Sequence, residues 1–186
     1  MVAGVDEVGR GALCGPVVAA AVVLGEGFDT TGLDDSKRLT ARQRERLAER
    51  VRASARGWAV GRAEPREIDA INILQATLVA MRRAVEALCV RPDLVLVDAL
   101  TIPGLDVEQR AIVKGDALSV SIAAASIVAK VTRDALMIEL DARHPGYGLA
   151  RNMGYACQDH RDALRRLGPS PIHRRSFNGT QAWLFS

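Results

Sequence analysis

The sequence predicts an α/β fold with a mixed central sheet flanked by helices. Three observations favour this class: apolar runs of strand length, segments of helical periodicity between them, and carboxylates placed where strands end. The first two apolar runs, Val2 to Asp6 and Pro16 to Leu24, are separated by a glycine-rich turn and predict a buried hairpin. Later strands alternate with helices, as parallel crossover connections do. With 186 residues, we expect a single domain over residues 1–186.

The next elements follow in chain order. Thr40 with Gln43 forms a capping box that begins a helix through about Ala55, and Gly57 to Ala63 predicts a short strand. Pro65 opens a second helix. Its apolar positions follow helical spacing at Ile71, Leu74, Leu78, Met81, Val85 and Leu88.

The second half of the chain continues this alternation. Asp93 to Asp98 is an apolar run ending in a carboxylate, which predicts a central strand buried on both faces, and Ala111 to Val113 is a further short strand. Ser119 to Arg143 predicts a long helix, in which the small residues 123–126 can approach the sheet closely. Asp159 to Leu167 predicts a C-terminal helical segment.

Composition argues against several classes of protein. The longest apolar run, Pro16 to Leu24, has the length of a strand and is too short for a membrane helix, so we expect no membrane contact. The acidic pair near the N-terminus does not fit a signal peptide, which favours a cytoplasmic location. Cys14, Cys89 and Cys157 lack the paired spacing of a zinc site or a disulfide framework. Nothing requires a second subunit, and we expect a monomer.

The charge pattern is compatible with nucleic acid but does not require it. The net charge is +3, and among the 25 basic residues only three are lysines, Lys37, Lys114 and Lys130. Arginine binds phosphate in a bidentate manner, so an arginine-rich surface suits a polyanion. A GC-rich genome would produce the same bias, and both readings stay open.

Four acidic residues stand where strands end. Asp6 and Glu7 close the first strand, Asp98 closes a later one, and Asp116 follows the run 111–113. Side chains at the carboxyl ends of strands can converge on one crevice, where clustered carboxylates repel one another unless a cation is bound. Oxygen ligands without histidine or cysteine suit Mg²⁺ or Mn²⁺. We therefore expect a divalent-metal site at Asp6, Glu7, Asp98 and Asp116, although each acid alone would read as an ordinary turn residue.

The tripeptide Gly9-Arg10-Gly11 follows the acidic pair immediately. Flanking glycines let the backbone approach a ligand closely, and Arg10 stands where a phosphate or sugar would lie. A simple tight turn is the alternative, and the phosphate-binding loop of nucleotide hydrolases is excluded because its GxxxxGK[ST] pattern is missing.

Several ordered motifs make the chain resemble bacterial ribonuclease HII, the type 2 ribonuclease H family, from Val2 to about Phe177. They are Gly4 to Gly11, Gly15 to Ala20, Asp35 to Thr40, Val97-Asp98, Lys114 to Asp116 with Ala123 to Asp134, Gly154-Tyr155, and His173 to Phe177. The chain departs from the family pattern at Met153, where a lysine is common, and at Ala156-Cys157.

The resemblance implies a ribonuclease H-like fold and an endonuclease that cuts RNA in RNA–DNA hybrids and on the 5′ side of single ribonucleotides in duplex DNA. It implies that Asp6, Glu7, Asp98 and Asp116 are the catalytic, metal-binding acids, with Mn²⁺ or Mg²⁺ as cofactor. It further implies that Gly9, Arg10, Gly11 and Tyr155 recognise the 2′-hydroxyl at the junction, which is the group that separates RNA from DNA. Asp134 is a rival for the fourth acid, but its place inside a helix favours an ion pair.

Further residues are expected to contact phosphates: Ser36, Lys37, Lys114, Arg174 and Arg175. For each, a solvated surface charge is the alternative. His144, His160 and His173 do not cluster by spacing; His144 and His160 are expected to be structural, and His173 stays undecided.

The C-terminus carries a separate hypothesis. Gln181, Leu184 and Phe185 have the Q-x-x-L-F spacing of peptides that dock in the groove of the replication sliding clamp, on a possible flexible tail at 178–186. The alternative is that the aromatic residues of the tail pack on the domain.

Two rivals share the fold, and one comes from another class. Type 1 ribonuclease H lacks the Gly-Arg-Gly arrangement, and ribonuclease HIII has an extra N-terminal domain for which we expect no room before Asp6. A nucleic-acid-binding protein that has kept the fold without catalysis is the third alternative, which the presence of all four acids disfavours.

Overall fold

The computed structural model describes residues 1–33 and 39–181. Its strands are β1 (Val2–Val8), β2 (Val17–Val23), β3 (Gly57–Ala63), β4 (Leu94–Asp98) and β5 (Glu108–Ile112). Its helices are α1 (Ala41–Ser54), α2 (Pro65–Glu86), α3 (Gly115–Leu118), α4 (Val120–Arg143), α5 (Leu149–Asn152), α6 (Gln158–Leu167) and α7 (Asn178–Gln181).

These strands form a mixed sheet in the order β3-β2-β1-β4-β5. β1 pairs antiparallel with β2, and β2 pairs antiparallel with β3, so the first three strands form a meander. β4 pairs parallel with β1, and β5 pairs parallel with β4. The predicted α/β class with a mixed sheet is therefore confirmed.

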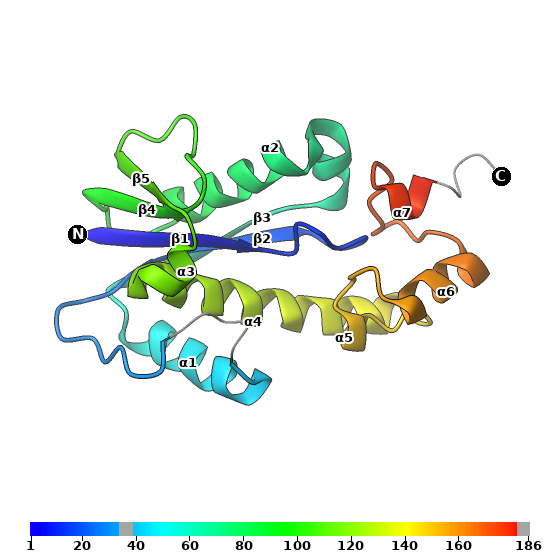
Figure 1. Cartoon of the computed structure of the whole chain (residues 1–186), viewed down its shortest axis with the longest axis horizontal. Coiled ribbons are helices and arrows are strands. Elements are labelled where there is room, and N and C mark those ends of the chain that lie inside the picture. Colours follow the sequence, from blue (N-terminus) through cyan, green and yellow to red (C-terminus); the bar gives the residue numbers. More distant parts are fainter. Residues whose placement is uncertain (34–38, 182–186) are drawn as a thin grey trace.

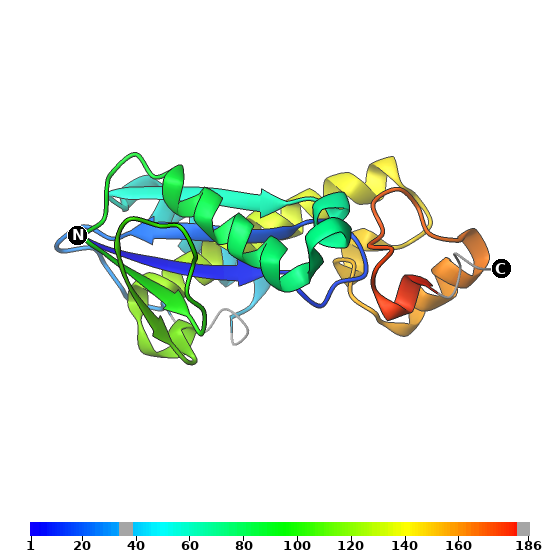
Figure 2. The ribbon, with the colours of Figure 1, turned by 90° about the horizontal axis from the view of Figure 1, so that it is seen from above.

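Helices cover both faces of the sheet. Figure 1 shows α2 on one face and α4 with α1 on the other. The α2 side encloses a core with Val5, Val17 and Met81, and the α4 side encloses another with Val22, Val51 and Val128. Viewed from above, α5, α6 and α7 lie beyond the ends of the strands, where they extend the domain (Figure 2).

Helix α4 lies unusually close to the sheet. A Cβ atom added to Gly4 in β1 would stand 2.1 Å from the backbone carbon of Ser121, so no side chain fits between the two backbones. The predicted small-residue segment 123–126 is buried on the same side. This close packing fixes α4 against the strand that carries Asp6.

Two predicted elements match their sequence signals, and one differs. Thr40 and Gln43 form the predicted capping box of α1, and every residue of β2 is buried. In β4, however, only Val95 and Val97 are fully buried, while the alternate residues are half-buried. The prediction of burial on both faces was wrong because α4 on the second face packs mainly against β1 and β2 and covers β4 little.

The predicted apolar stripe of α2 is interrupted. Ile71 and Leu74 are 39% and 42% exposed, against the expectation that both face the core. The reason is Asn72, whose φ of 65° and ψ of 165° break the helix. Its Oδ1 accepts hydrogen bonds from the backbone N–H groups of Leu74 and Gln75, as the cap of a new helix does. The helical phase restarts there, so spacing counted across the break no longer identifies one face.

The C-terminal part of the described chain is packed against the domain. Residues 178–181 form α7, and Thr180 is fully buried, which corrects the expectation of a flexible tail beginning at 178. Thr180 Oγ1 donates to the carbonyls of Arg174 and Phe177, which ties α7 to the preceding segment. Across residues 1–33 and 39–181, no helix is long and apolar enough to span a membrane.

Candidate active site

The sheet register brings the predicted acids together. Val5 of β1 lies opposite Val97 of β4 in parallel pairing, so the next residues, Asp6 within β1 and Asp98 at the end of β4, lie side by side. The expectation that Asp6 and Glu7 close the first strand was wrong, because β1 continues to Val8 in its pairing with β2. The backbone N–H of Gly115 donates to Asp98 Oδ1 at 2.7 Å. This hydrogen bond holds the start of α3, and with it Asp116, beside the end of β4.

All four acids line one pocket of about 310 Å³. Its other walls include three residues of the predicted recognition set, Gly9, Arg10 and Tyr155. The pocket thus unites seven residues that the sequence singled out from four separate segments. Asp134, the rival for the fourth acid, forms an ion pair with Lys130 Nζ at 2.7 Å instead.

The carboxylates in this pocket are buried and mutually repulsive. Burial first, and then the nearby charges of Glu7 and Asp98, raise the pKa of Asp6 from its ordinary 3.8 to about 8, although hydrogen bonds from Ser126 and the Glu7 N–H lower it. Burial also raises the pKa of Glu7, although Arg10 opposes the shift. Without a cation, the surroundings of Asp6 and Glu7 favour their protonated forms.

One buried oxygen in the pocket has an unmet hydrogen-bonding capacity. Arg10 Nη1 donates to Glu7 Oε1 at 3.2 Å, but Glu7 Oε2 finds no hydrogen-bond partner among the described residues. A buried carboxylate oxygen without a donor is costly, and a metal ion would satisfy it. The residues present therefore fit a hard divalent cation: four carboxylates, raised carboxyl pKa values and an orphaned oxygen.

The loop after β1 is held in a conformation that needs glycine at its first position. Gly9 has φ +90°, and a Cβ atom there would lie 2.1 Å from Arg133 Nε. At Gly11, in contrast, an added Cβ would meet nothing within 4 Å. The first glycine is thus required by the fold, while the second leaves open space that a ligand can occupy.

Arg174 holds this loop from behind. We predicted a phosphate contact, and the structure corrects that prediction: the side chain is fully buried. Its guanidinium donates to the carbonyls of Gly9, Arg10 and Gly15 at distances of 2.7–3.0 Å. The five donors of a guanidinium allow it to bind several carbonyls at once. The sequence did not indicate this role, because nothing distinguishes Arg174 from the exposed Arg175 next to it.

Arg133 is the second fully buried arginine. It donates to the carbonyls of Pro16, Cys14 and Met153, so it joins the loop after β1 to the turn before Tyr155. Its Cζ atom also lies 5.4 Å from the centre of the Tyr155 ring, within cation–π range.

The other predicted phosphate contacts lie away from the pocket lining or outside the described residues. Lys114 is exposed and precedes α3 in a left-handed conformation. Arg175 is exposed, and its backbone N–H donates to Asp69. Ser36 and Lys37 lie outside the described residues, as do Leu184, Phe185 and the side chain of Gln181.

The structure adds three polar residues that sequence reasoning did not place in the site: Arg44, Ser126 and Lys130 line the pocket. Ser126 and Lys130 lie four residues apart on α4, so they share the helix face that packs toward β1. That spacing could have indicated from the sequence that Ser126 and Lys130 reach the site, whereas nothing in the sequence indicated that Arg44 on α1 does.

Comparisons with known proteins show the family to which the chain belongs. The family model described as ribonuclease HII matches residues 3–180. A ribonuclease HII of Desulfitobacterium hafniense strain Y51 is 58% identical over 183 residues, which cover 98% of this chain and 70% of that protein.

Solved structures agree as well. Ribonuclease H2 of Pyrococcus horikoshii OT3 superposes with a TM-score of 0.80 at 29% identity, covering 97% of this chain and 95% of that one. The ribonuclease HII in a PCNA complex from Archaeoglobus fulgidus superposes with a TM-score of 0.77 at 28% identity, covering 94% and 92%. The fold is the ribonuclease H-like fold, and the chain belongs to the ribonuclease HII family of metal-dependent ribonucleases H.

Proposed function

We propose that this protein is an endonuclease that cleaves the RNA strand of RNA–DNA hybrids and cuts on the 5′ side of single ribonucleotides in duplex DNA. The products are a 3′-hydroxyl and a 5′-phosphate. The observation that supports this most directly is the convergence of Asp6, Glu7, Asp98 and Asp116 with Gly9, Arg10 and Tyr155 in one pocket. Such an activity serves ribonucleotide excision repair and the removal of RNA primers, in the cytoplasm, where bacterial DNA is replicated.

The four carboxylates are the proposed ligands of two Mg²⁺ or Mn²⁺ ions. Bound there, such ions would supply a nucleophilic water and charge stabilisation for the leaving oxygen in attack at phosphorus. The carboxyls of Asp6 and Glu7 must lose their protons to bind them, and the orphaned Glu7 Oε2 becomes satisfied. Gly115 N–H keeps Asp98 oriented for the same purpose.

Recognition of the ribose is assigned to the loop and to Tyr155. With its carbonyls fixed by Arg174, the loop 9–11 presents backbone groups toward the pocket, and the open space at Gly11 lets a sugar approach. Tyr155 is 37% exposed, so one part of its ring is available to stack on the sugar that follows the ribonucleotide. A 2′-hydroxyl is distinguished here by hydrogen bonding and by shape.

Basic side chains around the pocket are the proposed phosphate contacts. Arg44 and Lys130 line the pocket itself, and the exposed Lys114 and Arg175 extend the basic surface outward. Ser36 and Lys37 complete the proposed set from outside the described residues. Such contacts position the duplex and add salt dependence, but they do not select the ribose.

The test is a DNA duplex with one embedded ribonucleotide, incubated with Mg²⁺ or Mn²⁺ and analysed for product ends. Cleavage on the 5′ side, giving a 3′-hydroxyl and lost in Asp6→Asn, supports the proposal. Tight binding without cleavage by the native protein would instead support the non-catalytic alternative.

A sliding clamp is the proposed protein partner. The Archaeoglobus fulgidus relative was solved as a complex with PCNA, and the Q-x-x-L-F spacing of Gln181, Leu184 and Phe185 fits a clamp-binding peptide. Deleting residues 182–186 should abolish clamp binding while cleavage of a short duplex continues. Unchanged clamp affinity after the deletion would sink this part of the proposal.

A further inference from the structure

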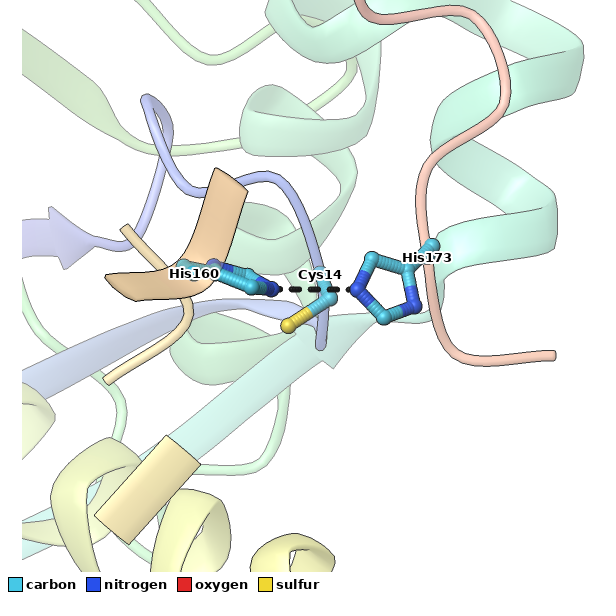
Figure 3. A group of neighbouring side chains, drawn as sticks. All are labelled: Cys14, His160 and His173. Carbon is cyan, nitrogen blue, oxygen red and sulfur yellow. Dashed lines mark hydrogen bonds between the residues drawn. The ribbon is translucent and has the colours of Figure 1, made fainter. Parts of the chain in front are cut away.

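Two buried histidines face each other beside the turn that precedes Tyr155. His160 lies on α6 and His173 in the segment after it, and both are at most 2% exposed. Their Nε2 atoms are 3.1 Å apart, and Figure 3 shows the two rings meeting edge to edge next to Cys14. The two residues lie thirteen positions apart in sequence, so spacing alone did not reveal the pair.

The groups at the two ends of this pair fix where its protons are. At one end, the backbone N–H of Ser170 points at His173 Nδ1 at 3.0 Å, so Nδ1 is an acceptor and the proton of His173 is on Nε2. His173 Nε2–H then donates to His160 Nε2, which leaves the proton of His160 on Nδ1. That proton is donated to the carbonyl of Tyr155 at 3.0 Å. A backbone donor and a backbone acceptor thus impose one direction on the whole chain of hydrogen bonds.

The same atoms also resemble a metal site, because Cys14 Sγ and one nitrogen of each histidine lie within 4.8 Å of one another. The direction of the hydrogen bonds argues against it. A neutral His173 whose Nδ1 accepts from a backbone N–H has no lone pair at Nε2 to offer a metal. Two buried arginines, Arg133 and Arg174, lie close to Cys14 and disfavour a second cation. Burial also raises the pKa of the Cys14 thiol to about 12, so its sulfur stays protonated.

The turn at Met153 and Gly154, which this pair supports, has a backbone conformation that its residues do not prefer on their own. Met153 has φ 51°, a left-handed conformation that non-glycine residues rarely adopt, and Gly154 follows with φ 79°. Three successive carbonyls are each held from elsewhere in the chain. Arg133 Nη1 binds that of Met153, Leu13 N–H that of Gly154, and His160 Nδ1 that of Tyr155. The Tyr155 carbonyl also accepts from the Cys157 N–H at 2.9 Å. Each contact therefore helps define where the Tyr155 ring stands.

We propose that His160 is a positioning residue. Its Nδ1–H, whose tautomer is fixed by His173, holds the Tyr155 carbonyl, so it fixes Tyr155 relative to the loop 9–11 and sets the preference for the ribose–deoxyribose junction. This inference rests on the proposed role of Tyr155. The neighbour of His173, Arg174, binds the carbonyls of Gly9 and Arg10. Two consecutive residues thus hold two neighbouring parts of the pocket lining, Arg174 directly and His173 through His160.

Two substitutions at His160 separate its two contacts. Asparagine places an amide nitrogen where Nδ1 was, so His160→Asn keeps the donor to the Tyr155 carbonyl and loses the contact with His173. Glutamine reaches the Nε2 position instead, so His160→Gln keeps the contact with His173 and loses the donor to Tyr155. Both remove the ring, which makes them matched controls for a purely structural effect.

The readout is the ratio of kcat/KM on a duplex with one ribonucleotide to kcat/KM on a uniform RNA–DNA hybrid. We expect His160→Gln to lower this ratio about tenfold and His160→Asn to lower it less than about threefold. Tyr155→Ala is the benchmark. If Tyr155→Ala leaves the ratio unchanged, the proposed role of Tyr155 is wrong. If Tyr155→Ala lowers the ratio but the two His160 variants behave alike, only the positioning inference is wrong.

A second measurement does not depend on how the variants fold. Long-range ¹H–¹⁵N correlation spectra of the native protein report histidine tautomers directly, and we expect neutral His160 protonated at Nδ1 and neutral His173 at Nε2. The opposite assignment would overturn the inference. So would stoichiometric Zn²⁺ in the purified protein that is lost in Cys14→Ala, because it would identify a metal site.

Discussion

Arg174 Nη2 donates a hydrogen bond to the carbonyl of Gly9 at 2.7 Å, across 165 positions of sequence. The end of the described chain therefore shapes the loop that follows the first strand. Its neighbour Arg175 is exposed, although both arginines belong to one basic motif. The pair offers a direct comparison between an arginine that supports the pocket and one that is free to contact nucleic acid.

Replacing Arg174 should destabilise the fold. In Arg174→Met the carbonyls of Gly9, Arg10 and Gly15 lose their buried donor, which we expect to cost about 3 kcal/mol or more. Thermal denaturation should show a midpoint lower by about 6 °C or more, since 1 kcal/mol corresponds to about 2–4 °C in a domain of this size. Arg175→Met should stay within about 0.5 kcal/mol of the native protein. Equal losses in both variants would contradict the structure.

The two glycines of the loop should respond differently to alanine. Gly9→Ala meets the Arg133 side chain and a positive φ, so we expect it to lower both stability and activity. Gly11→Ala enters open space and should leave the thermal midpoint within about 2 °C, because surface substitutions of this kind change stability little. If a sugar approaches Gly11 closely, the same variant should still raise KM for the ribonucleotide duplex. A Gly11→Ala enzyme with native KM would remove Gly11 from the recognition set.

Asp116 and Asp134 form a matched test of the fourth catalytic acid. Asp116 lines the pocket, whereas Asp134 pairs with Lys130. We expect Asp116→Asn to reduce kcat by about 10³-fold, as loss of a metal ligand does, and Asp134→Asn to reduce it by less than about tenfold. Single-turnover cleavage at saturating Mg²⁺ measures both. The reverse order of effects would exchange their roles.

The raised pKa of Asp6 has a consequence for stability in the absence of metal. Asp6 stays protonated in the folded protein up to about pH 8, whereas the unfolded chain loses this proton near pH 3.8, so stability falls as pH rises between these values. Asp6→Asn removes this dependence. In EDTA, its advantage in thermal midpoint over the native protein should therefore be larger at pH 8.5 than at pH 5.5, by several degrees.

Divalent cation should reverse the effect. Since metal binding requires the deprotonated carboxylate, Mg²⁺ should stabilise the native protein more at pH 8.5 than at pH 5.5, and should stabilise Asp6→Asn little at either. An Asp6→Asn variant whose advantage in EDTA does not change with pH would refute the raised pKa.

Local signals predicted most of the fold. The capping box at Thr40, the period of β3 and the apolar run of β2 depend on neighbours in sequence, and the structure contains each of them. The break at Asn72 was missed because an asparagine inside a helical pattern reads as a tolerated polar residue until its side chain is seen to cap the next turn.

Some residues of the candidate site could likewise be predicted from the sequence, and others could not. The acids were found because strand ends converge in an α/β sheet, which is a general property of the topology. Arg174 and the His160–His173 pair were not found, because their partners are backbone groups and side chains of other segments, and a residue type does not show which carbonyl it will meet. Contacts of this kind are set by the tertiary structure.

The two buried arginines have one more effect, and it acts at a distance. Arg133 and Arg174 bind neutral carbonyls, so their positive charges are not cancelled by the groups that hold them. Mobile salt ions screen charges inside a protein much less than charges on its surface. The attraction of these two charges for a phosphate near the loop 9–11 should therefore depend less on ionic strength than that of exposed lysines and arginines.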